Sequence, residues 1–212
     1  DTELNVNLTS IRERLRPQDL PGLAATRDYD PETVGVAFET QAFSTVGFSV
    51  NLETGTAINI VPEFGVQPEL ADSRSVEFEL LWRPIDRLRA DTTYLSTQLD
   101  DRGGAGKIFS NEIFRTRWNY QFTKELSLRF IAQYEETDAG VFTSLEDEKS
   151  MNYDALVRYV INPWSALYVG FNSNSSNFEL IDTEEGTELI RTGGLRRDGE
   201  QFFVKFSYLL QP

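Results

Sequence analysis

Apolar and aromatic side chains occupy every second position near the end of this 212-residue chain, in the segment EQFFVKFSYLLQP at residues 200–212. The row consists of Phe202, Val204, Phe206, Tyr208 and Leu210, and the residues between them are Phe203, Lys205, Ser207 and Leu209. Side chains of an extended chain alternate between two faces, so the segment predicts a β-strand with one apolar and one mixed face. Such a strand suits the closing strand of an outer-membrane β-barrel and the last strand of a soluble β-sandwich equally well.

The same alternation recurs along the chain and predicts about ten strands. They cover residues 2–12, 34–52, 56–66, 73–83, 87–99, 110–122, 125–136, 151–161, 165–175 and 201–210. A tight turn is expected at Glu53, Thr54 and Gly55, and prolines keep residues 17–32 out of regular structure. An even number of strands places both termini at the same end of the strands, which in a barrel is the short-turn, periplasmic end.

The connections between these strands alternate in length. Short turns are predicted at residues 84–86, 123–124 and 162–164, and longer polar loops at 100–109, 137–150 and 177–199. Outer-membrane barrels combine short periplasmic turns with long extracellular loops, whereas a soluble sandwich has no reason to sort its loops in this way. The sorting favours an all-β, antiparallel, up-and-down transmembrane barrel over residues 1–212. Its strands could close a ten-stranded barrel or form the last ten of a wider one.

Along the middle of the predicted strands, charged side chains fall on one face. The members of this charged row are Glu77, Glu79, Arg87, Arg89, Asp91, Arg115, Arg117, Arg129, Glu135, Asp154, Arg158 and Lys205. In a barrel they would face the lumen, because a cationic side chain on the lipid face costs about 2–4 kcal/mol at the bilayer midplane. Arginine and carboxylate rows in a water-filled lumen would steer polar or charged solutes. In a narrow barrel the same residues would form a salt-bridged plug.

Several aromatic residues lie near the short turns, where an interfacial girdle belongs. The girdle candidates are Trp82, Tyr120, Phe122, Trp164 and Tyr208. A soluble sandwich would be expected to scatter its aromatic residues through the core, so their position also favours the barrel.

Composition excludes several classes of function. The chain has no cysteine and no histidine, which removes disulfides, thiolate nucleophiles, Ser-His-Asp catalysis and most transition-metal sites. A formal charge of −14 without a basic stripe speaks against nucleic-acid binding. We expect no enzymatic activity, no catalytic residues, no cofactor and no metal. The chain opens on Asp1 without the basic and apolar regions of a signal peptide, so we expect a processed chain or a piece of a longer one.

Three phrases of the sequence carry a resemblance to a known family. NYQFTKELSLR, NPWSALYVG and QFFVKFSYL occur in this order between residues 55 and 210. This region resembles the C-terminal part of a large bacterial family of unknown function. In that family, a domain similar to a family-nine carbohydrate-binding module precedes an outer-membrane barrel. The resemblance implies a barrel whose upstream domain lies on the periplasmic side.

These features predict a protein of the outer membrane of a Gram-negative bacterium. We expect a membrane-spanning anchor or a porin-like channel for small polar solutes. The expected partners are the lipid bilayer, lipopolysaccharide, and a protein or upstream domain on the periplasmic side. Two alternatives stay open at this point: a soluble all-β binding module, and a structural subunit of a cell-envelope assembly.

Overall fold

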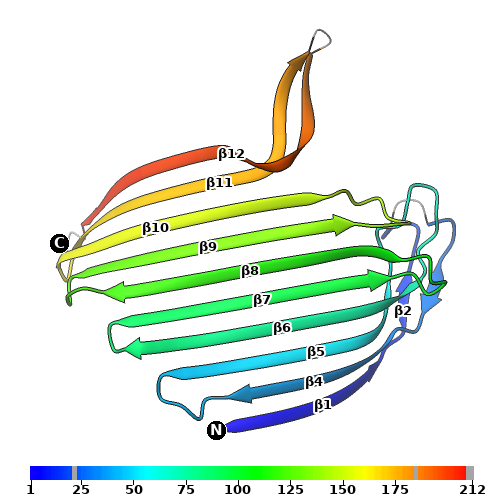
Figure 1. Cartoon of the computed structure of the whole chain (residues 1–212), viewed down its shortest axis with the longest axis horizontal. Coiled ribbons are helices and arrows are strands. Elements are labelled where there is room, and N and C mark those ends of the chain that lie inside the picture. The colour runs from blue at the N-terminus through cyan, green and yellow to red at the C-terminus, as the bar shows by residue number, and fades with distance from the viewer. Residues whose placement is uncertain (21–22, 184–185, 209–212) are drawn as a thin grey trace.

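Ten strands form a single antiparallel sheet in the computed structural model, which describes residues 1–20, 23–183 and 186–208. The strands are β1 (Thr2–Ser10), β4 (Glu32–Thr40), β5 (Val46–Ile58), β6 (Leu70–Ile85), β7 (Leu88–Asp100), β8 (Lys107–Gln121), β9 (Leu126–Ala139), β10 (Glu148–Asn162), β11 (Ser165–Thr183) and β12 (Gly186–Tyr208). Each strand pairs with the next along the chain (Figure 1). The prediction of an all-β, antiparallel, up-and-down sheet is confirmed.

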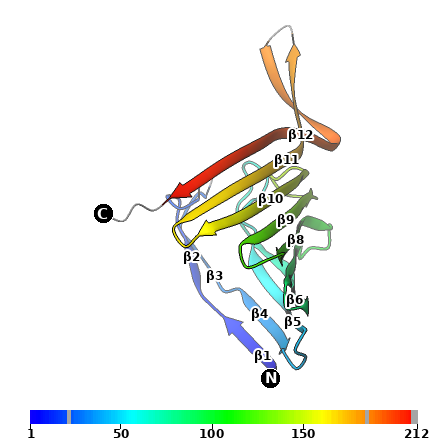
Figure 2. The same ribbon diagram turned by 90° about the vertical axis from the view of Figure 1, so that its left-hand side faces the viewer.

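The sheet is curved into a trough and its two edges are not joined (Figure 2). β1 forms one edge and β12 the other, and their residues are almost all exposed. Within the described residues, the predicted closure of the barrel is therefore not seen. β1 runs away from the short turns and β12 runs back toward them, so the two free edges are antiparallel to each other (Figure 1).

The first hairpin differs from its prediction. Residues 34–52 do not form one long strand, because a turn at residues 41–45 separates β4 from β5. The expected turn at residues 53–55 is also wrong, since these residues lie inside β5 and Gly55 pairs with Thr33. At Gly55, an added Cβ would collide with the carbonyl oxygen of Glu32. The glycine therefore permits a close approach of two strands rather than a turn.

The last hairpin is also longer than predicted. Residues 177–199 were expected to form a loop, but β11 and β12 continue as a two-stranded ribbon to Thr183 and Gly186. Irregular pairing at residues 174–178 coincides with the bend at which the ribbon leaves the sheet (Figure 1), as expected of β-bulges. The predicted end of the last strand, Leu209 and Leu210, lies outside the described residues.

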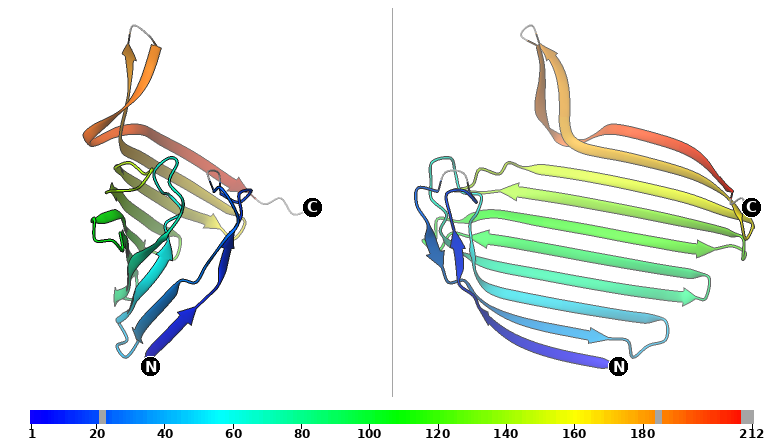
Figure 3. Two further views of the ribbon diagram at one scale, coloured as in Figure 1. Left: turned by 90° about the vertical axis from the view of Figure 1, so that its right-hand side faces the viewer. Right: turned by 180° about the vertical axis from the view of Figure 1, so that it is seen from behind.

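The long connections gather at the end of the sheet opposite the short turns (Figure 3). Residues 11–31 include the small hairpin of β2 (Glu13–Leu15) and β3 (Arg27–Tyr29). The Tyr29 hydroxyl donates to the carbonyl of Pro68 at 2.7 Å, which ties this hairpin to the connection between β5 and β6. A bridge between Pro62 and Thr143 ties that connection in turn to the one between β9 and β10.

The small buried core lies beneath these connections. Ala71, Leu99 and Ile108 cluster there, from β6, β7 and β8. Elsewhere, each strand of the sheet packs mainly on its two neighbours, so the sheet is a single layer. None of the described residues belongs to a helix long and apolar enough to cross a membrane.

Candidate functional site

The charged residues predicted from the sequence lie on one face of the sheet, here called the polar face. Partners in an antiparallel ladder project from the same side of the sheet. Asp91 pairs with Arg117, Arg117 with Ile131, and Ile131 with Asp154, which gives one continuous row across four strands. The same alternation puts these residues on that face: Glu77, Glu79, Arg89, Asp91, Arg115, Arg117, Arg129, Glu135, Asp154, Arg158 and Lys205. Arg87 lies in the turn before β7 and borders a hollow on the same face.

Asp91 is the centre of the main ion-pair cluster on the polar face. Its carboxylate accepts hydrogen bonds from Arg89 at 2.8 Å and from Arg117 at 3.2 Å. Asp154 instead accepts a hydrogen bond from the Asn172 amide at 2.8 Å. The sequence predicted arginine and carboxylate rows on this face, facing each other across a lumen. Among the described residues, only this cluster joins members of the predicted set.

Acidic and basic side chains occupy different parts of the polar face. On β4, β5 and β6 the charged residues that the strand register places on this side are acidic, and they are Glu39, Glu53, Glu77 and Glu79. β7 to β10 carry the arginines on this face, together with Asp91, Glu135 and Asp154. Sequence reasoning missed Glu53, because the first hairpin was misplaced and this residue was assigned to a turn. It also left out Glu39, although the odd position of Glu39 in a run with uncharged even positions was an available signal.

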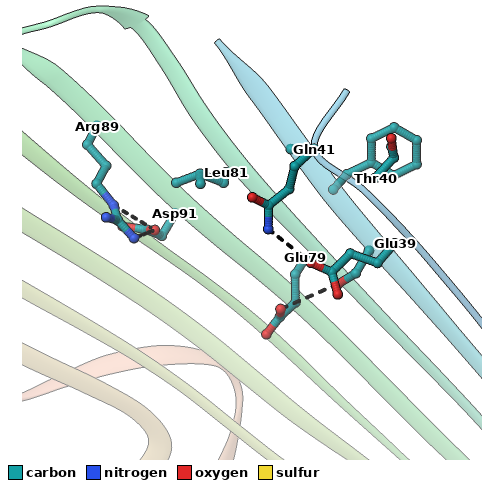
Figure 4. A pocket seen from close by; sticks show the side chains of 10 residues that line it. Glu39, Thr40, Gln41, Glu79, Leu81, Arg89 and Asp91 are labelled. Carbon is teal, nitrogen blue, oxygen red and sulfur yellow. Dashed lines mark hydrogen bonds and ion pairs between the residues drawn. The ribbon is translucent and has the colours of Figure 1, made fainter. Parts of the chain in front are cut away.

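A hollow of about 250 Å³ lies where the acidic part meets the arginine part (Figure 4). Glu39 and Glu79 border it on one side, and the Arg89–Asp91 pair borders it on the other. Gln41 donates to Glu39 at 3.0 Å. The arrangement can hold a small polar solute between side chains of opposite charge. The described residues contain no group of carboxylates placed to bind a metal ion.

The opposite face, here called the apolar face, is covered by aliphatic and aromatic side chains. Phe114 on β8 is 45% exposed, Val157 on β10 is 37% exposed and Phe202 on β12 is 68% exposed. Residues of this face that lie in register across neighbouring strands include Leu52, Val76, Phe130, Val169 and Val204. A sheet whose apolar face formed the core of a soluble domain would bury these side chains against a second layer. No described element covers this face.

Aromatic and charged residues mark the two margins of the apolar face. Near the short turns, Trp82 contacts Trp118 edge to face with ring centres 5.9 Å apart, and Tyr120 contacts Phe122 at 4.6 Å. The remaining girdle candidates are also near this end, since Tyr208 pairs with the residue that follows Trp164. At the loop end, ion pairs join neighbouring strands: Arg74–Asp100 at 3.0 Å and Lys149–Glu136 at 2.7 Å.

Comparisons with known proteins identify no family. No protein-family model matches the chain, and no curated protein matches it. Among solved structures, the chain is similar to a crystal structure of a Pseudomonas aeruginosa FadL homologue, with 11% sequence identity and a TM-score of 0.40. The match covers 98% of this chain and 62% of that chain. A similarity at this level carries no argument about function.

Proposed function

We propose that the chain forms ten strands of the wall of an outer-membrane β-barrel in a Gram-negative bacterium. The observation that carries this proposal is the uncovered apolar face of a single-layer sheet. Soluble monomers rarely expose apolar patches larger than a few hundred Å², and this face extends across all ten strands. Acyl chains would cover it, while the polar face lines the lumen.

The height of the apolar face suits a membrane. On β8, the face extends from Phe114, two residues after Glu112, to Tyr120, and Phe122 continues it at the turn directly after the strand. Roughly nine residues at about 3.3 Å each span about 30 Å along a strand, which tilting reduces to about the thickness of an outer-membrane apolar band. The charged margin would then meet the headgroups and lipopolysaccharide at the loop end, and the aromatic margin would lie at the periplasmic interface.

The lumen would be formed when the free edges of β1 and β12 acquire partners. Because these edges are antiparallel to each other, they can pair directly in a narrow barrel or through an even number of additional strands in a wider one. An upstream domain of the kind implied by the family resemblance would precede β1, whose start lies at the turn end (Figure 1).

Separated charge on the polar face favours a channel role over a purely structural one. A lumen with carboxylates on one wall and arginines on another has a transverse electric field, which orients and attracts polar or charged solutes. A plug held by salt bridges between neighbouring strands would need most arginines to be paired along the wall. Arg115, Arg129 and Arg158 make no ion pair within the described part of the chain. We therefore propose a porin-like channel for small polar solutes.

Single-channel conductance of the detergent-purified chain in a planar bilayer tests this function. The proposal predicts stable conducting steps, and it predicts that Arg115→Gln/Arg117→Gln lowers the preference for anions over cations. The matched control is Arg12→Gln/Arg14→Gln, which removes the same charge from the exposed loop region and should leave selectivity unchanged. A silent bilayer, from protein shown to be folded and inserted, would contradict the channel and leave an anchoring role.

A further inference from the structure

A second hollow on the polar face, of about 360 Å³, lies near the short turns and is lined by arginines from separate strands. Arg87 comes from the turn before β7, Arg89 from the start of β7, Arg129 from β9 and Arg158 from β10. Ser127 pairs with Arg158, so Arg129, two residues further along β9, lies diagonally next to Arg158 on the same face. Side chains in this diagonal relation are within reach of each other when they are long. We call this group the arginine hollow.

The positive charge of the arginine hollow is not neutralised by the protein. In the described part of the chain, Arg87, Arg129 and Arg158 form no ion pair, whereas Arg89 is paired with Asp91. Arg87 donates only to the carbonyl of Phe122, at 3.4 Å. The one carboxylate among the lining residues is Asp86, in the turn. Neighbouring like charges destabilise a sheet, so this grouping favours the binding of an anion.

The acidic composition of the chain makes a cluster of unpaired arginines unexpected. The chain has 34 acidic and 20 basic residues, so carboxylates are the more common charged partner. Three unpaired arginines around one hollow therefore run against the overall charge of the protein. Asn119, Gln121 and Ser127 supply neutral polar groups in the same lining. All the arginine side chains are exposed and accessible to a ligand.

We propose that the arginine hollow binds the phosphate group of a small soluble solute, with Arg129 and Arg158 as its main ligands and Arg87 completing the site. The guanidinium group is planar and always charged, and it binds phosphate through two parallel hydrogen bonds. The hollow faces the polar side of the sheet, so the ligand is a solute rather than a lipid headgroup. This inference rests on the proposed function only in assigning the polar face to an aqueous lumen, and it adds the class of solute.

Isothermal titration calorimetry with inorganic phosphate tests the site directly. The folded chain is kept in a maltoside detergent, which contains no phosphate, at constant ionic strength. We expect saturable binding that Arg129→Gln/Arg158→Gln weakens at least about tenfold, because the two substitutions remove the charge-assisted hydrogen bonds that hold the anion. The control Arg12→Gln/Arg14→Gln should bind like the unaltered chain. Circular dichroism and heat-dependent gel mobility verify that each variant is folded.

Two results would overturn the site. One is the absence of saturable binding by the folded chain, and the other is equal affinity in the Arg129→Gln/Arg158→Gln variant. A third result would be tighter binding of short-chain phosphatidylglycerol than of inorganic phosphate. It would assign the hollow to a lipid headgroup and contradict a solute site.

Failure of this site is distinguishable from failure of the channel. If the chain binds phosphate but does not conduct in bilayers, the arginine hollow is supported and the channel is contradicted. If the chain conducts but does not bind phosphate, the channel is supported and the arginine hollow is contradicted as a phosphate site.

Discussion

At the scale of single residues, Gly170 and Phe203 form a close pairing on the polar face. They are register partners on β11 and β12, and a Cβ added at Gly170 would collide with the ring of Phe203. Gly170→Val therefore forces the ring away from the strand or separates the strands. We expect a loss of about 1–3 kcal/mol in the free energy of unfolding, as for other overpacking changes, measured by urea titration in detergent.

Gly199 provides the matched control, because it lies on the same face and pairs with Asn174. A Cβ at Gly199 would have no heavy atom within 4 Å. Gly199→Val should change the unfolding free energy by no more than about 0.5 kcal/mol. Equal losses in the two variants would show that Phe203 does not occupy the space above Gly170.

Asp28 gives a pH-dependent prediction outside the sheet. Arg14 donates two hydrogen bonds to this carboxylate, at 2.6 and 2.8 Å, and holds the pKa of Asp28 below its ordinary value. A carboxyl with a lowered pKa stabilises the folded state fully above its ordinary pKa of about 3.9, and the contribution is lost as the pH falls through the lowered pKa. The ion pair between β2 and β3 should therefore persist at pH 5 and be lost in stronger acid.

Carboxyl chemical shifts measured by NMR check this prediction. In Arg14→Gln the titration midpoint of Asp28 should rise toward the ordinary value. Arg12→Gln should raise it less, because the interaction of Asp28 with Arg12 is weaker than that with Arg14. An unchanged midpoint in Arg14→Gln would contradict the proposed hydrogen-bonded pair.

At the scale of the strand, the two faces of β10 should respond oppositely to a new charge. Val157 lies on the apolar face, and Asn152 lies on the polar face of the same strand. Val157→Arg should cost about 2–4 kcal/mol when the protein is inserted in a bilayer, because the cation would face acyl chains. Asn152→Arg should be nearly neutral. Folding yield into lipid vesicles measures both, and equal yields would contradict a lipid-facing apolar side.

The central strands were predictable because their alternation is regular and their turns contain strong signals. β6 to β11 were placed within a few residues of their starts, next to turns such as Asn162–Pro163. The first hairpin was not predicted correctly, because the turn between β4 and β5 has the sequence QAFST and contains no glycine, proline, asparagine or aspartate. Both strands keep their apolar residues on even positions, so the turn left no break in the pattern.

The ribbon formed by the end of β11 and the start of β12 was not predicted from the sequence for a different reason. Beyond Ser176, β11 no longer pairs with β10, so neither face of the ribbon is packed on the sheet. Its sequence is rich in charged residues, and its apolar residues, Phe178, Leu180, Ile181, Leu189 and Ile190, do not alternate regularly. Alternation reports burial of one face rather than hydrogen bonding itself, so a solvated ribbon has no sequence pattern of its own.

At the scale of the whole molecule, the alternation of side chains along each strand predicted which residues share a face of the sheet. It did not predict which residues of neighbouring strands lie side by side. The charged row identified from the sequence does lie on the polar face. The separation of carboxylates on β4 to β6 from arginines on β7 to β10 depends on the register of every pair of strands. The arginine hollow depends on the same registers, since Arg87 and Arg158 are far apart in sequence.

The central claim, that lipid covers the apolar face and water the polar face, is tested most directly by a nitroxide scan along β8. The chain has no cysteine, so single cysteines can be introduced at Phe114, Arg115, Thr116, Arg117 and Trp118 and labelled in liposomes. We predict that positions 114, 116 and 118 are accessible to oxygen in the bilayer, and positions 115 and 117 to a water-soluble nickel complex. A soluble module would contradict the claim: even positions would be shielded from both reagents, and the labelled chain would stay out of the liposomes.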